Sequence, residues 1–87
     1  MPSNMSEPIF PAYRALVNGR SLFRIGSATT FTEVQRIGTR SVVFEIVAET
    51  YPERLRIAEL LAATDGTVVP IQAAEFERAL EAAGNRS

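Results

Sequence analysis

Apolar and polar side chains alternate most regularly between residues 41 and 49. Because successive side chains of a strand point to opposite faces, this period of two predicts a strand with one face in the core. The set expected in the core is Val42, Phe44, Ile46 and Ala48, and the set expected to face outward or to be half covered is Ser41, Val43, Glu45, Val47 and Glu49.

A first hairpin is predicted around Asn18-Gly19. Short runs that mix apolar residues with arginine flank this dipeptide, which is typical of a tight turn in which both central residues have φ > 0. A two-residue turn at this point pairs residue 13 with 24 and residue 15 with 22. One side of the hairpin then carries Tyr13, Ala15, Val17, Arg20, Leu22 and Arg24, and the other carries Arg14, Leu16, Ser21, Phe23 and Ile25.

A second hairpin is predicted around Gly38-Thr39, because a type II′ turn requires glycine at its first central position. Strict pairing across this turn would set Glu33 beside Phe44 and a glutamine, Gln35, beside a valine. We therefore expect a bulge or a longer loop in this hairpin.

Two helices are predicted in the second half of the chain. The first begins at Thr50 and Glu53, which have capping-box spacing, and ends at Asp65-Gly66. Its expected buried stripe is Ile57, Leu60, Leu61 and Thr64. The second spans residues 72–84, with Ala73, Phe76, Leu80 and Ala83 on one face. Between them, residues 67–71 predict a short strand that Pro70, which lacks an N–H donor, either confines to a sheet edge or truncates.

These elements predict a small single α+β domain. The order β-β-β-β-α-β-α with short links indicates a mainly antiparallel sheet packed against two helices. We expect a flexible N-terminal tail over residues 1–11, the domain over residues 12–84, and a C-terminal tail over residues 85–87.

The residue types exclude most familiar catalytic chemistry. The 87-residue chain has no Cys, no His and no Lys, so disulfides, the common zinc sites, Ser-His pairs and Schiff-base chemistry are absent. Its five glycines have no phosphate-loop spacing. We therefore expect no catalytic residues, no cofactor and no metal; an enzyme would need a deep pocket lined by two close carboxylates.

Charge is distributed unevenly along the chain. Residues 14–40 contain five arginines against one glutamate, a net charge of +4, whereas residues 41–87 contain four arginines against eight acidic residues, a net charge of −4. Such asymmetry indicates either an acidic partner for the basic half or neutralisation of the two halves within one fold.

The first hairpin supplies the main functional hypothesis. If the helices cover the side with Leu16, Phe23 and Ile25, the opposite side is too apolar for an idle surface. Either a second layer of this chain covers that side, or another chain does. We therefore predict a non-enzymatic protein-interaction or accessory module that binds a protein partner or a second copy of itself. The predicted partner-binding residues are Tyr13, Val17, Arg20, Leu22 and Arg24.

The alternative is a nucleic-acid-binding module, since arginine pairs with phosphate and stacks on rings. Its predicted residues are Arg20, Arg24, Arg36 and Arg40, with Phe23 as a stacking ring.

The sequence shows neither the pattern of a signal peptide nor that of a membrane span. No basic start with an apolar segment precedes the domain, and the longest apolar run is far shorter than a membrane span. We expect a cytoplasmic protein.

Overall fold

The computed structural model describes residues 9–63 and 66–84. The predicted tail residues 1–8 and 85–87 lie outside the described residues, as do Thr64 and Asp65 of the predicted first helix.

Five strands form one antiparallel sheet, in the spatial order β4-β3-β2-β1-β5. The strands are β1 (Ala12–Leu16), β2 (Ser21–Ser27), β3 (Thr30–Ile37), β4 (Arg40–Val47) and β5 (Val68–Pro70). The first four follow one another as a meander. The short β5 lies beside β1 at one edge, as the proline in it predicts, and β4 forms the other edge. The predicted α+β class and element order are confirmed.

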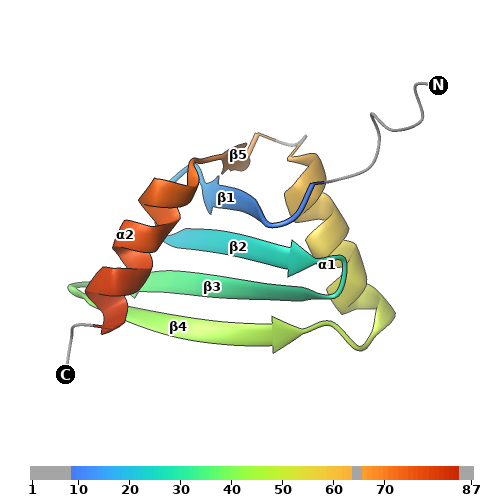
Figure 1. Cartoon of the computed structure of the whole chain (residues 1–87), viewed down its shortest axis with the longest axis horizontal. Helices are drawn as coiled ribbons and strands as arrows, with labels where there is room; N and C mark the ends of the chain where they lie inside the picture. The colour runs from blue at the N-terminus through green and yellow to red at the C-terminus, as the bar shows by residue number, and fades with distance from the viewer. Residues whose placement is uncertain (1–8, 64–65, 85–87) are drawn as a thin grey trace.

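The two helices lie on opposite faces of the sheet and at opposite ends of the strands (Figure 1). Helix α1 (Tyr51–Ala62) connects β4 to β5 and so crosses one face from edge to edge. Helix α2 (Ala73–Gly84) follows β5 and crosses the other face, where it contacts β2, β3 and β4. Each helix therefore covers its face at the end where it crosses and leaves the other end open (Figure 1).

This arrangement divides the core into two layers. The α1 layer contains Ala12, Phe23, Ile25, Phe31, Ala48, Ile57, Leu60 and Val68. The α2 layer contains Ala15, Leu22, Val34, Phe76 and Ala79. Each large apolar side chain fully buried in these layers contributes roughly 1.5–3 kcal/mol through the hydrophobic effect, so both helices help to hold the sheet.

The beginning of α1 agrees with the sequence, but its end does not. The Thr50 hydroxyl accepts from the Glu53 N–H, and the Glu53 side chain accepts from the Thr50 N–H, which completes the predicted capping box. The helix ends at Ala62, where Ala63 adopts a left-handed conformation (φ 50°) and donates to the Glu59 carbonyl at 3.0 Å. It therefore ends before the Asp65-Gly66 position that the sequence favours.

The first hairpin has the predicted register and a different turn. Tyr13 pairs with Arg24 and Ala15 with Leu22. The strands stop earlier than expected, however, and the Gly19 N–H donates to the Leu16 carbonyl at 2.8 Å. Gly19 has φ +77°, whereas Asn18 does not have a positive φ. The prediction of two left-handed residues is wrong because the loop has four residues instead of two.

The second hairpin keeps the strict register that the sequence disfavours. Glu33 lies opposite Phe44, and the irregularity in pairing falls instead between β2 and β3, at residues 25–27. The polar side chain is accommodated because its carboxylate accepts from Ser21 Oγ at 2.8 Å and from Gln35 Nε2 at 3.2 Å. Gly38 has φ +63°, as the predicted turn requires.

Candidate partner-binding surface

Helix α2 covers the hairpin side on which the sequence places a partner. Leu22 is only 2% exposed and lies in the α2 layer of the core. The Tyr13 ring packs against Phe76 at 5.8 Å between centroids. Arg24 lies 5.3 Å from the centre of the same Phe76 ring. Of the two possibilities that the sequence leaves open, the structure shows a second layer of the same chain.

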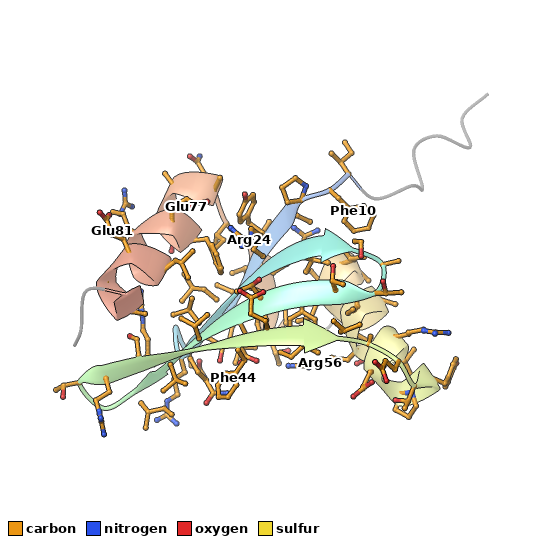
Figure 2. All side chains as sticks on the ribbon, turned by 60° about the horizontal axis from the view of Figure 1, so that its bottom comes forward. Phe10, Arg24, Phe44, Arg56, Glu77 and Glu81 are labelled. Atoms are coloured by element: carbon orange, nitrogen blue, oxygen red, sulfur yellow. The ribbon has the colours of Figure 1, made fainter. Side chains whose placement is uncertain are left out.

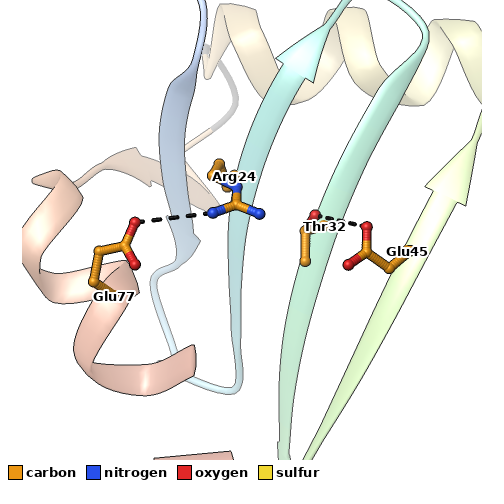
Figure 3. A network of polar contacts seen from close by, with 4 residues as sticks. All are labelled: Arg24, Thr32, Glu45 and Glu77. Atoms are coloured by element: carbon orange, nitrogen blue, oxygen red, sulfur yellow. Dashed lines mark hydrogen bonds and ion pairs between the residues drawn. The ribbon is translucent and has the colours of Figure 1, made fainter. Parts of the chain in front are cut away.

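Arg24 also forms the ion pair drawn in Figure 3, with its Nη1 3.8 Å from Glu77 Oε2 of α2. Both side chains are partly exposed, so this pair contributes at most about 1 kcal/mol. The remaining residues of the predicted surface, Val17 and Arg20, are exposed on the turn between β1 and β2. The structure therefore leaves two of the five predicted side chains open to a partner.

The arginines of the nucleic-acid hypothesis lie in different surroundings. Arg20 and Arg36 line one open groove of about 520 Å³, together with Asn18, Ser21 and Gln35. Arg24 lies under α2, where it contacts Phe76 and Glu77, and Arg40 is exposed at the beginning of β4. Phe23 is fully buried, with the Arg56 guanidinium 5.8 Å from its ring centre, so its ring is not available for stacking.

Strand β4 carries most of the exposed apolar surface of the sheet. Four of its side chains are large, apolar and exposed: Val42 (39%), Val43 (38%), Phe44 (40%) and Val47 (60%). They lie on both faces of the strand, and Phe44 projects on the α1 side, opposite the face that carries α2 (Figure 2).

The expectation that Val42 and Phe44 belong in the core is therefore wrong. Of the predicted core set, Ala48 is buried and Ile46 packs partly against the α1 layer. Helix α1 crosses the face only at that end of β4, so the other end stays open. An alternating pattern identifies the face of a strand but does not indicate how far along it the covering helix extends.

The main-chain groups on the outer side of β4 have no strand to pair with among the described residues, because β4 is the last strand of the sheet. The Ala48 N–H donates to the Thr29 carbonyl at 2.7 Å. Since the direction of N–H groups alternates along an antiparallel strand, the even-numbered residues of β4 bond to β3. The residues whose main-chain groups point outward are Ser41, Val43, Glu45 and Val47.

The two edges of the sheet differ in the features that prevent further pairing. Strand β5 is three residues long and ends in Pro70, and a short edge with proline resists the addition of another strand. Strand β4 is eight residues long, has no proline, and carries only Arg40 and Glu45 as charged side chains. Glu45 accepts from Thr32 Oγ1 at 3.3 Å, so its carboxylate points toward β3 and away from the open edge (Figure 3).

Sequence reasoning placed no partner-binding residue on β4. The available signals were the two valines of the outward-facing set, Val43 and Val47, and the polar residues that a strict register sets opposite this strand. Apolar residues in both sets indicate that both faces of the strand are covered, by this chain or by another, but do not show that the strand lies at an edge.

No protein-family model matches the chain, and neither the curated proteins nor the solved structures contain a match. Within residues 9–63 and 66–84, acidic side chains form no group of three or more that could hold a metal ion. No helix in this part of the chain is long and apolar enough to cross a membrane.

Proposed function

We propose that this chain is a protein-interaction module that binds its partner by strand addition at β4. The observation that supports this function is the open edge: an eight-residue strand on which four residues point their main-chain groups outward, with exposed apolar side chains on both faces. In strand addition, the main-chain hydrogen bonds supply affinity and the alternating side chains supply specificity. Both requirements are met by the same strand.

The proposal keeps the class of function that the sequence suggests and moves the surface. The hairpin residues Tyr13, Leu22 and Arg24 are engaged by α2 of the same chain. Natural proteins protect an exposed sheet edge by shortening it, charging it or covering it. Here only the β5 edge has such protection, so β4 is the edge suited to a partner.

Residue-specific photocrosslinking tests this function. A photoreactive amino acid replaces Val43 on β4 in one variant and Val69 on β5 in the other, and each is irradiated in extract of the source organism. Both valines lie on edge strands, and their exposures match at 38% and 39%. They also share the α2 face, because Val69 pairs with Ala15.

We expect a discrete crosslinked product from position 43 and none from position 69. Mass spectrometry then identifies the crosslinked chain and the residue that carries the adduct. Equal products from both positions, or none from position 43, would contradict strand addition at β4.

A further inference from the structure

We propose that the partner of β4 is a second copy of this chain, whose own β4 adds in the antiparallel direction to form one ten-stranded sheet. The proposal rests on the interaction function above and specifies its partner. A twofold axis normal to the sheet, passing between the two Phe44 residues, relates the two copies. The surface is then self-complementary, as a twofold interface requires.

Charge favours the antiparallel direction. Arg36 and Arg40 lie at the beginning of β4 or beside it, whereas Glu45 and Glu49 lie toward its end. Antiparallel pairing brings the basic end of one copy to the acidic end of the other. Parallel pairing would set like charges side by side, which destabilises a sheet.

Side-chain matching selects the register. With Phe44 opposite Phe44 of the second copy, Val42 lies opposite Ile46. On the α1 face, every pair between residues 42 and 46 of the two strands is therefore apolar. On the other face, Val43 lies opposite Glu45, and Ser41 opposite Val47. A shift that centres the axis on Glu45 would oppose two carboxylates directly. A shift to Val43 would place Arg40 inside the paired segment, opposite Ile46, whereas the Phe44 register pairs residues 41–47 and leaves Arg40 outside this segment, opposite Ala48. The Phe44 register avoids both conflicts.

The same register covers the open end of the sheet. A twofold axis normal to the sheet keeps the α1 face of one copy continuous with the α1 face of the other. Antiparallel pairing then sets the uncovered end of one β4, at Val42, beside the end of the other where α1 packs on Ala48. The half face that each copy leaves open lies next to the helix of its partner.

The outward main-chain groups also meet in this register. Val43 pairs with Glu45 of the second copy and Ser41 pairs with Val47, and all four residues point their N–H and carbonyl groups away from β3. Phe44 then occupies a pair without mutual hydrogen bonds, in which the two Cα atoms lie about 4.5 Å apart.

Disulfide trapping tests the register, because the natural chain contains no cysteine. The Phe44→Cys chain should crosslink to itself under mild oxidation, since two Cα atoms about 4.4–6.8 Å apart allow a disulfide. Val42→Cys is the matched control: two copies of residue 42 are offset by four residues, about 13 Å along the strands, and should not crosslink. Efficient crosslinking of Val42→Cys or Val43→Cys with none of Phe44→Cys would overturn the proposed register.

A pair of charge variants tests the dimer without cysteine. Val43→Glu sets a carboxylate against Glu45 of the other copy, whereas Val43→Lys sets an ammonium there. Because the effect occurs twice per dimer, we expect Val43→Glu to dissociate at least about 10-fold more readily than Val43→Lys. Val69→Glu, on the β5 edge, should match the natural chain. Sedimentation velocity over a concentration series measures all four proteins, and circular dichroism verifies that each is folded.

The outcomes separate this proposal from the function on which it rests. If the purified natural chain stays monomeric at high concentration while the probe at position 43 crosslinks a different protein in extract, the second copy is wrong and strand addition stands. If the probe crosslinks instead to residues 1–8 of its own chain, the second copy is also wrong. If Val43→Glu and Val43→Lys both dissociate the dimer equally, the Phe44 register is overturned.

Discussion

Arg14 links β1 to the end of α1, a contact that the sequence does not predict. Its Nε donates to the Leu60 carbonyl at 3.1 Å and its Nη2 to the Leu61 carbonyl at 3.0 Å. The last carbonyls of a helix have no partner within the helix, and a planar guanidinium can bind two of them at once. Arg14 thus provides part of the C-terminal capping that the sequence assigns to Gly66.

Replacing Arg14 with methionine keeps an unbranched apolar side chain in place of the arginine stem and removes these hydrogen bonds. Because the donor is charged and partly buried, we expect Arg14→Met to lower the free energy of unfolding by about 1.5–3 kcal/mol. Urea denaturation followed by circular dichroism measures the change. Arg20→Met is the matched control, since Arg20 is exposed on a turn and a surface change of this kind costs within about 0.5 kcal/mol. Equal losses in the two variants would contradict the capping role.

Single residues show where sequence reasoning reaches its limit. The pattern correctly assigned Tyr13, Leu22 and Arg24 to one face of the hairpin. It could not show what lies over that face, because the contact with Phe76 comes from residues more than fifty positions away in the chain. A face is a local property of a strand, whereas its covering is a tertiary one.

At the scale of elements, α1 has a capping box whose charge is coupled to folding. The Glu53 carboxylate accepts from the Glu49 N–H at 2.8 Å and from the Thr50 N–H at 3.1 Å. These hydrogen bonds favour the ionised form and lower the pKa of Glu53 below its ordinary value of 4.5. A lowered pKa in the folded state stabilises the fold above the ordinary pKa, and this stabilisation is lost as the pH falls through the lowered value.

We therefore expect Glu53→Gln to be less stable than the natural chain at pH 7, with a difference that narrows as the pH falls below about 4.5. Urea midpoints measured between pH 7 and pH 3 test this dependence. Glu59→Gln controls for the loss of charge. The Glu59 carboxylate lies on the same helix and forms no hydrogen bond or ion pair with a described residue. The same narrowing in both variants would rule out the capping box as its origin.

Element types were predictable from the sequence because their signals are local. Alternation, capping residues and turn glycines gave all seven elements in their order, and Pro70 gave the edge position of β5. The same local signals misplaced Val42 and Phe44, because a strand at an edge and a strand in the middle of a sheet can share one alternating pattern. The candidate surface on β4 thus required the strand order, which pattern alone does not supply.

At the scale of the whole molecule, the diagonal placement of α1 and α2 explains why so much of β4 stays open. A helix of twelve residues crosses the sheet but covers only one end of the strands. With one helix on each face, each face keeps one uncovered end, and both uncovered ends extend to the β4 edge. Two helices on the same face would have covered that face fully and left the other entirely open, so the observed arrangement concentrates the exposed apolar area at one edge.

The unequal edges lead to a prediction for amide hydrogen exchange. In the single chain, the N–H groups of Val42, Phe44 and Ile46 bond to β3 and exchange only when the sheet opens, whereas those of Val43 and Glu45 point outward and exchange with little protection. When β4 pairs with a second copy, the outward amides become donors as well. We expect their exchange to slow as the protein concentration rises, while exchange at Val42 and Phe44 changes little.

The β5 edge provides the control within the same experiment. The Val17 N–H donates to the Thr67 carbonyl and the Ile71 N–H to the Tyr13 carbonyl, so by alternation the Val68 N–H points away from β1. Exchange at Val68 should not depend on protein concentration, because nothing in the proposed pairing reaches this edge. If exchange slows at Val68 in parallel with Val43, the cause is general aggregation instead of a defined contact at β4. If exchange at Val43 stays constant up to millimolar protein, β4 does not pair with a second copy.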